Sequence, residues 1–193
     1  MLTTLLISFA TAQTVPDMPL LHNPSPTVPG LPANRSEPND SMGAKAVAHA
    51  RTYLGVAYAW NGRDTKSLPN LDCMGLPFRS FGKVQGRSWR SYSVNPSDLV
   101  ASGKLGKSVP SLAGVSRAEL DTAQLEIGDI LYLLTTNEIP DEPLFTSGDV
   151  SYWPWHMVMY AGDGQVIHAK PGAEVVVQDV MEVWFERLVV TRL

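Results

Sequence analysis

Residues 155–170, "WHMVMYAGDGQVIHAK", decide the fold because they predict a hairpin that carries two histidines. Gly-Asp-Gly at 162–164 separates two runs of β-branched and aromatic residues, which is a strong hairpin signal. With a loop of these three residues, Val158 pairs with His168, and His156 lies on the same face as His168, one diagonal step away. A two-residue loop would place the histidines on opposite faces, so the loop length tests this hypothesis.

The rest of the C-terminal half predicts the sheet to which this hairpin belongs. Further β-branched runs alternate with Gly, Pro and Asp, which is typical of antiparallel strands. The predicted strands are residues 128–134, 156–161, 165–169, 174–179 and 187–192. The connection over 135–155 is long for a loop between two strands, and its aromatic residues form either a wall for substrate or a loop packed on its own domain.

Helices are predicted in the N-terminal half of the folded part. The first follows a cap at Asn39, Asp40 or Ser41 and ends at Gly55. A second is expected to start at Cys73, and a short one near 95–102. Helices first and strands later indicate an α+β fold, with N-terminal helices packed on a central antiparallel sheet of about five strands.

The N-terminal region before these helices has a different composition. Residues 1–12 match a short signal peptide, since an apolar run ends in the small-x-small pattern Ala10-Thr11-Ala12. No basic residue precedes the run, so a buried strand is the alternative. Residues 13–42 are rich in proline and predict an extended linker, which leaves residues 43–193 as the folded domain.

Composition excludes several classes of function. The chain has 193 residues, is 44% hydrophobic and carries a net charge of −4, so it can form an ordinary core and does not have the charge of a nucleic-acid-binding protein. No apolar run reaches the roughly 20 residues that a membrane span needs. We therefore expect a monomer without a nucleic acid partner and without stable membrane insertion.

The single cysteine, Cys73, lies in "NLDCMGLPFRSFG" (70–82). A lone cysteine in a secreted chain is a reactive thiol, an intermolecular link or a buried bystander. A helix N-terminus lowers the pKa of a thiol, whereas the charge of the expected cap, Asp72, opposes the thiolate. A reactive Cys73 therefore needs a cationic partner.

His156 and His168 suit the task of activating that thiol. His156 can take the thiol proton and return it to a leaving amine, while His168 orients His156 and fixes its tautomer. An ordinary hairpin with two structural histidines is the plain alternative. Two histidines on one hairpin and a distant cysteine have no recognised zinc spacing, so we expect no metal and no cofactor.

The segments "LGVAYAWNG", "LDCMGL", "IGDILYL" and "WHMVMYAGDGQVIHA", in this order, resemble the NlpC-type cell-wall peptidases, a branch of the papain-like cysteine peptidases. The resemblance spans about residues 44–192. It implies a papain-like fold with Cys73 as nucleophile, His156 as general base and acid, and His168 as orienting residue. It also implies that Tyr58 lies beside the site.

The same resemblance implies a secreted or periplasmic hydrolase of peptidoglycan stem peptides, often cutting between D-glutamate and the next diamino acid. We expect Tyr58, Asp72 and Trp155 to bind substrate. Met74 stands where the family usually has serine, and Trp155 directly precedes His156. These departures keep two alternatives open: an inactive wall-binding module of the same fold, and an amidase that acts on a different amide.

Overall fold

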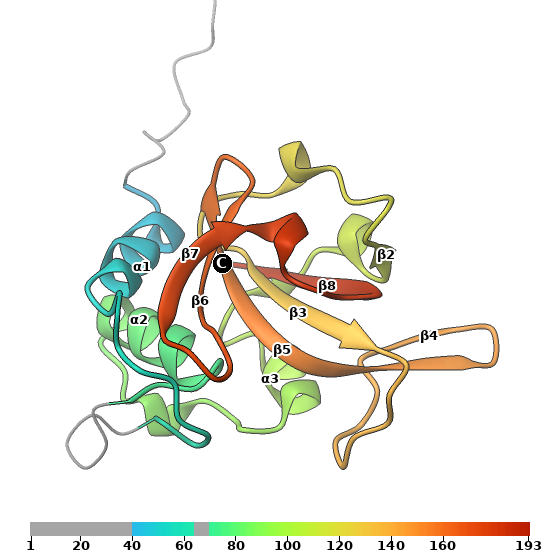
Figure 1. Ribbon diagram of the computed structural model, residues 1–193, viewed down its shortest axis with the longest axis horizontal. Helices are drawn as coiled ribbons and strands as arrows, with labels where there is room; N and C mark the ends of the chain where they lie inside the picture. Colours follow the sequence, from blue (N-terminus) through green and yellow to red (C-terminus); the bar gives the residue numbers. More distant parts are fainter. Residues whose placement is uncertain (1–39, 64–69) are drawn as a thin grey trace, which may run out of the picture. The chain divides into compact units, whose positions relative to one another are not determined.

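The computed structural model describes residues 40–63 and 70–193 of the chain. One antiparallel sheet has the strand order β1-β8-β3-β5-β6-β7, with β2 also paired to β8 and β4 to β5 (Figure 1). The α-helices are α1 (Met42–Arg51), α2 (Gly75–Gln85) and α3 (Pro96–Ser102). The strands are β1 (Lys107–Ser108), β2 (Val115–Ser116), β3 (Ile130–Thr135), β4 (Phe145–Ser147), β5 (Val150–Gly162), β6 (Gln165–Ala169), β7 (Val175–Asp179) and β8 (Arg187–Arg192).

The predicted α+β class is confirmed, and the expected sheet of about five strands is roughly right. The five long runs form β3, β5, β6, β7 and β8. The remaining strands, β1, β2 and β4, are only two or three residues long. Such short segments carry too few residues to show an alternating pattern in the sequence.

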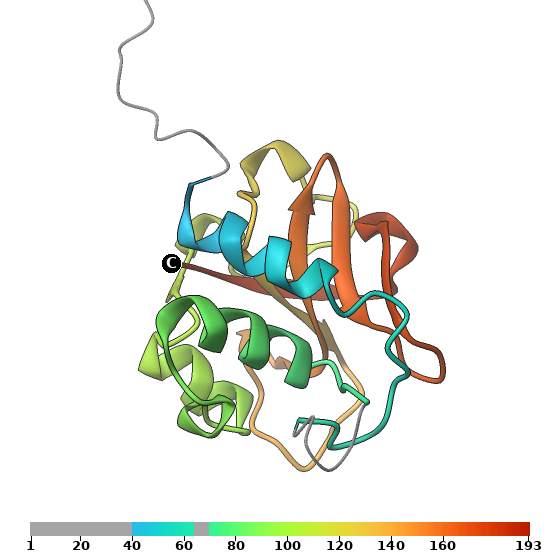
Figure 2. The same cartoon turned by 90° about the vertical axis from the view of Figure 1, so that its left-hand side faces the viewer.

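The helices form where the sequence supplies caps. The Ser41 side chain accepts a hydrogen bond from the Ala44 N–H at 3.0 Å, which starts α1 at one of the three predicted caps. Asn95 caps α3 in the same way, and Gly86 ends α2 with a φ of 65°. Figure 2 shows α1 and α2 lying together across one face of the sheet.

Apolar side chains cover both faces of the sheet. On the helical face, Phe78 and Phe81 of α2 share one buried cluster with Met157 of β5. On the other face, Val158 of β5 and Leu133 of β3 belong to a second cluster. Because successive residues of β5 are buried on opposite faces, this strand is fixed in place from both sides.

The β5–β6 hairpin corrects the predicted loop. Gly162 pairs with Gln165, so the loop has two residues, Asp163 and Gly164, and both have positive φ angles of 53° and 73°. The expected three-residue loop is therefore wrong. The register shifts between Tyr160 and Gly162, and this bulge adds one residue to β5. This extra residue restores the predicted alternation of side chains along β5, so His156 and His168 still lie on the same face of the sheet.

The expected long loop over 135–155 is in large part a second hairpin. Its C-terminal portion forms β4 and the start of β5, where Phe145 pairs with Tyr152. Figure 1 shows this hairpin extending away from the rest of the sheet. Alternation is weak here because Trp153, Pro154 and Trp155 interrupt it.

The predicted signal peptide (1–12) and most of the predicted linker (13–42) lie outside the described residues. Their assignments remain predictions. Within residues 40–63 and 70–193, none of the helices combines the length and the apolar character that crossing a membrane requires.

Candidate active site

Cys73 lies directly before the first turn of α2, held there by Asp72. Asp72 Oδ1 accepts hydrogen bonds from the Met74 N–H at 3.1 Å and the Gly75 N–H at 2.5 Å. Asp72 therefore satisfies backbone donors at the helix start, as expected, although α2 begins at Gly75 rather than at Cys73. The Cys73 side chain is half-buried.

Arg63 is the cation beside this end of α2. Its Nε donates to Asp72 Oδ2 at 2.9 Å, and its Nη2 lies 3.7 Å from Met74 Sδ. The side chains of Arg63 and Asp72 are 14% and 1% exposed, so the pair is largely screened from water. Both carboxylate oxygens of Asp72 are thus already engaged; its predicted role in binding substrate stays a prediction.

His156 on β5 and His168 on β6 are in direct contact. His156 Nε2 lies 2.7 Å from His168 Nδ1, and the rings meet edge to face at 76°. Each residue is 3% exposed. Among the described residues, His156 Nδ1 has no hydrogen-bond partner. If His156 Nε2 donates its proton to His168 Nδ1, then His156 Nδ1 is left with a lone pair to accept a proton.

A bulge in β5 sets the direction of Trp155. Leu133 pairs with His156 and Leu134 with Pro154, which leaves Trp155 as the extra residue. Bulges redirect side chains and accommodate proline inside a sheet. The Trp155 ring stacks on the His156 ring, with 5.1 Å between the ring centroids. It also packs against the ring of the exposed Trp184, with 5.7 Å between the centroids.

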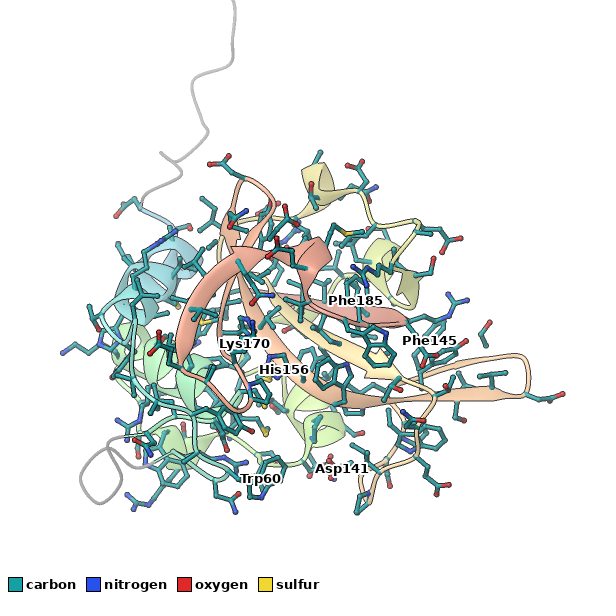
Figure 3. All side chains as sticks on the ribbon, in the orientation of Figure 1. Trp60, Asp141, Phe145, His156, Lys170 and Phe185 are labelled. Carbon is teal, nitrogen blue, oxygen red and sulfur yellow. The ribbon has the colours of Figure 1, made fainter. Side chains whose placement is uncertain are left out.

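Cys73 and His156 line the same cavity, whose volume is about 400 Å³. Its walls are mostly apolar, and its charged groups are Arg63, Asp72 and Asp141. The apolar and aromatic lining residues include Trp60, Met74, Pro96, Tyr132, Trp155 and Met157. Figure 3 shows Trp60 and Asp141 together on the same side of His156. His168 does not line the cavity and contacts it through His156.

Burial controls the protonation of the thiol. It raises the pKa of Cys73 to about 12, and the charge of Asp72 adds to this rise. The backbone N–H of Met157 and the charge of Arg63 lower the pKa only in part. Desolvation and the charge of Asp72 together therefore outweigh the groups that favour the thiolate.

Burial also keeps the histidines neutral. It lowers the pKa of His156 to about 3, with a further contribution from His168. Burial lowers the pKa of His168 as well, and Lys170 adds to this, whereas Gln178 opposes it. Gln178 lies diagonally across from His168 on the neighbouring strand, although His168 Nε2 makes no hydrogen bond of ordinary geometry within the described chain. At neutral pH both histidines are uncharged.

Tyr58 lies close to the thiol on the segment that precedes Arg63. Its N–H donates to the Ala173 carbonyl at 2.8 Å, and its side chain is half-buried. Burial raises the pKa of Tyr58 to about 12, with smaller contributions from the neighbouring charges of Cys73 and Asp72. Tyr58 thus remains a hydrogen-bond donor at any physiological pH.

The cavity residues that were not anticipated include Trp60, Arg63, Tyr132 and Asp141. Tyr132 is 1% exposed, and its position in the apolar run "ILYLL" gives no sign that it reaches a cavity. Arg63 carried only an ambiguous signal, because the buried Asp72 needs a cation but both Arg63 and Lys66 lie shortly upstream of it in the sequence. No cluster of three or more metal-ligating side chains occurs among the described residues.

Comparison with known proteins identifies the family. A family model described as the NlpC/P60 family matches residues 55–192. The chain belongs to the NlpC/P60 family. A search of curated proteins returned no match.

Solved structures that are similar to this chain include domains described as NlpC/P60 or P60. The NlpC/P60 domain of the peptidoglycan hydrolase SagA is 26% identical, with 78% of this chain and 98% of that chain covered and a TM-score of 0.48. The P60 domain of antigen MAP1204 from M. avium subspecies paratuberculosis is 18% identical, with coverage of 78% and 93% and a TM-score of 0.51. A hypothetical invasion protein of Mycobacterium tuberculosis is 21% identical, with coverage of 78% and 61% and a TM-score of 0.51.

Proposed function

We propose that this protein is a cysteine hydrolase that cleaves the amide bond between D-glutamate and the following diamino acid in peptidoglycan stem peptides. The observation that carries the proposal is the contact of 2.7 Å between His156 and His168, with His156 and Cys73 on the walls of one cavity. The family includes cell-wall peptidoglycan hydrolases. The predicted signal peptide supports a secreted or periplasmic location at the cell envelope.

Acylation follows from the protonation states of the two reacting groups. The Cys73 thiol and His156 are both neutral at rest, so the thiol proton moves to His156 Nδ1 as the sulfur attacks the substrate carbonyl. The resulting imidazolium then protonates the leaving amine, which departs and leaves a thioester on Cys73. In the second half, His156 removes a proton from water, the hydroxide displaces the sulfur, and the thiol is regenerated.

His168 makes this proton transfer possible by holding its neighbour. Its Nδ1 accepts the His156 Nε2–H, which keeps the basic Nδ1 of His156 directed away from the pair. The backbone N–H of Cys73 and the hydroxyl of Tyr58 are the donors that we assign to the developing oxyanion. Burial of both histidines removes competing water from the hydrogen bond between them.

The cavity suits a short peptide with charged ends. A volume of about 400 Å³ accommodates a short peptide, and the walls carry Asp141 together with the ion pair of Arg63 and Asp72. Trp155 supplies a flat apolar surface beside His156, where we place the substrate backbone.

Digestion of purified peptidoglycan tests the proposal. The full chain is incubated with peptidoglycan, and the released fragments are identified by mass spectrometry. We expect new stem-peptide fragments ending in D-glutamate, which disappear with Cys73→Ala. Fragments cut at another amide bond would support the hydrolase activity but assign it to a different bond.

The inactive wall-binding module predicts a different outcome of the same experiment. Wild type would then release no fragments, and both wild type and Cys73→Ala would sediment with the wall. That result would overturn the proposed function.

A further inference from the structure

A second pocket lies away from Cys73, between the C-terminal parts of α1 and α2. Its volume is about 270 Å³. The basic side chains of Arg79, Lys83 and Arg87 line it together with His49. Within the described part of the chain, no acidic side chain lines this pocket, which we name the basic pocket. Two exposed cations on the wall of one pocket, Lys83 and Arg87, form an arrangement that can receive an anion.

The pKa of His49 reflects the positive electrostatic potential inside the basic pocket. Its pKa is lowered by burial first, and then by the charges of Lys83 and Arg79. His49 Nδ1 is buried and has no hydrogen-bond partner among residues 40–63 and 70–193. The same charges that disfavour an imidazolium favour a bound anion.

The chemistry of the lining selects the class of anion. Arginine and lysine side chains together bind phosphate strongly, because guanidinium groups form paired hydrogen bonds to phosphate oxygens. The pocket also has aromatic walls, Tyr53 and Trp89, and Tyr53 packs against His49 with 5.3 Å between ring centroids. The volume leaves room for a sugar beside a phosphate group.

We propose that the basic pocket binds a phosphate group carried on a sugar, as in the phosphodiester-linked polymers of bacterial cell walls. Arg79 is the α2 lining residue nearest to the start of the helix, about 6 Å along it from Gly75. Among the described residues, the basic pocket shares no lining residue with the cavity that contains Cys73. Occupancy therefore anchors the protein on the wall without blocking the cavity that contains Cys73. Duplex nucleic acid is disfavoured by the net charge of −4.

Binding of glucose 1-phosphate to the full chain tests the proposal. NMR follows the ring signals of His49, which are assigned with His49→Gln. We expect saturable shifts and a rise in the pKa of His49, because the bound phosphate offsets the neighbouring cations. In the double variant Lys83→Gln, Arg87→Gln the affinity falls at least about tenfold.

A matched control separates this site from general charge. Lys45→Gln with Lys107→Gln removes the same net charge from exposed positions elsewhere, and we expect the affinity to stay within about twofold. Equal loss in both double variants, or unchanged binding in Lys83→Gln, Arg87→Gln, overturns the proposal. The affinities are compared only for variants that thermal unfolding shows to be folded. Because Lys83 and Arg87 are exposed, we expect their substitution to leave the fold intact.

Sedimentation with isolated walls identifies the source of the sugar phosphate. Walls that keep their phosphodiester polymers should retain wild type, and walls stripped with hydrofluoric acid should release it. Equal retention of the protein on both kinds of wall, with glucose 1-phosphate still bound in the basic pocket, is a different outcome. That result would overturn anchoring on the wall and assign the pocket to soluble sugar phosphates. Displacement of glucose 1-phosphate by duplex DNA at lower concentration overturns the assigned class of ligand.

Discussion

The two sides of the cavity place their reactive groups by different means. On the α2 side, a largely buried ion pair between Arg63 and Asp72 and two backbone hydrogen bonds fix the residue before Cys73. On the hairpin side, His156 and His168 are held by strand register and burial, and among residues 40–63 and 70–193 they have no charged hydrogen-bond partner. The comparison teaches that charge positions the nucleophile, whereas desolvation keeps the base neutral and able to accept its proton.

The largest effect is expected at the centre of the hairpin side. His156→Gln preserves the approximate size of the side chain but removes the group that accepts the thiol proton. We expect kcat/KM on a soluble stem peptide to fall at least about 10⁴-fold. Chromatography of the released peptide measures this, and a loss below tenfold would remove His156 from the mechanism.

His168 should be the next most sensitive position, with a graded response. His168→Ala deprives the His156 Nε2–H of its acceptor, and we expect a loss of about 10³-fold in kcat. His168→Asn keeps an oxygen acceptor and should recover part of this loss. Equal activity in the two variants would show that His168 acts by packing alone. The pH dependence of kcat in each variant shows whether the loss comes from the orientation of His156 or from reduced stability.

The ion pair on the α2 side should matter chiefly for stability. Arg63→Met leaves the carboxylate of Asp72 without its cation, and we expect the free energy of unfolding to fall by about 3 kcal/mol. The exposed pair of Lys45 and Asp40, at 2.7 Å, provides the control. Lys45→Met should cost much less than Arg63→Met, because solvent screens the exposed pair. Urea denaturation compares both variants, and similar losses would contradict the difference between the two pairs.

The hairpin side should also make stability depend on pH. Burial lowers the pKa of folded His156 from 6.5 to about 3, so the unfolded chain binds more protons than the folded chain between these values. Stability from this group is therefore present above pH 6.5 and is lost as pH falls toward about 3.

His156→Gln isolates that contribution from the carboxylates that titrate in the same range. Between about pH 6.5 and 4.5, we expect wild type to lose about 2 kcal/mol more than the variant. Thermal unfolding at a series of pH values measures the difference. Parallel curves for the two proteins would show that His156 is not desolvated in solution.

The sequence predicts the long elements of this fold and the contact between the histidines. β5 and β6 are recognisable because their β-branched residues flank a Gly-Asp-Gly turn. The prediction that the two histidines share a face is correct although the predicted loop length is wrong, because one bulge residue in β5 compensates for one residue of loop. A bulge leaves no clear trace in a single sequence, so register near it comes from tertiary packing.

The rest of the site depends on contacts between segments that are distant in sequence. The pKa of Cys73 is raised chiefly because burial desolvates the thiol, and no local pattern at the start of α2 reveals that burial. The orientation of Trp155 follows from its unpaired place in β5. Arg63 and Asp141 meet the cavity from loops, where side-chain direction has no periodicity to read.

The central claim is that the neutral base on the hairpin activates the thiol that lies just before α2. A stem-peptide analogue with an electrophilic carbonyl tests it most directly, because Cys73 is the only cysteine in the chain and mass spectrometry can assign the adduct without ambiguity. We predict one adduct per chain on Cys73 in wild type, formed at least about 100-fold more slowly in His156→Gln. Equal rates in wild type and His156→Gln would contradict the account.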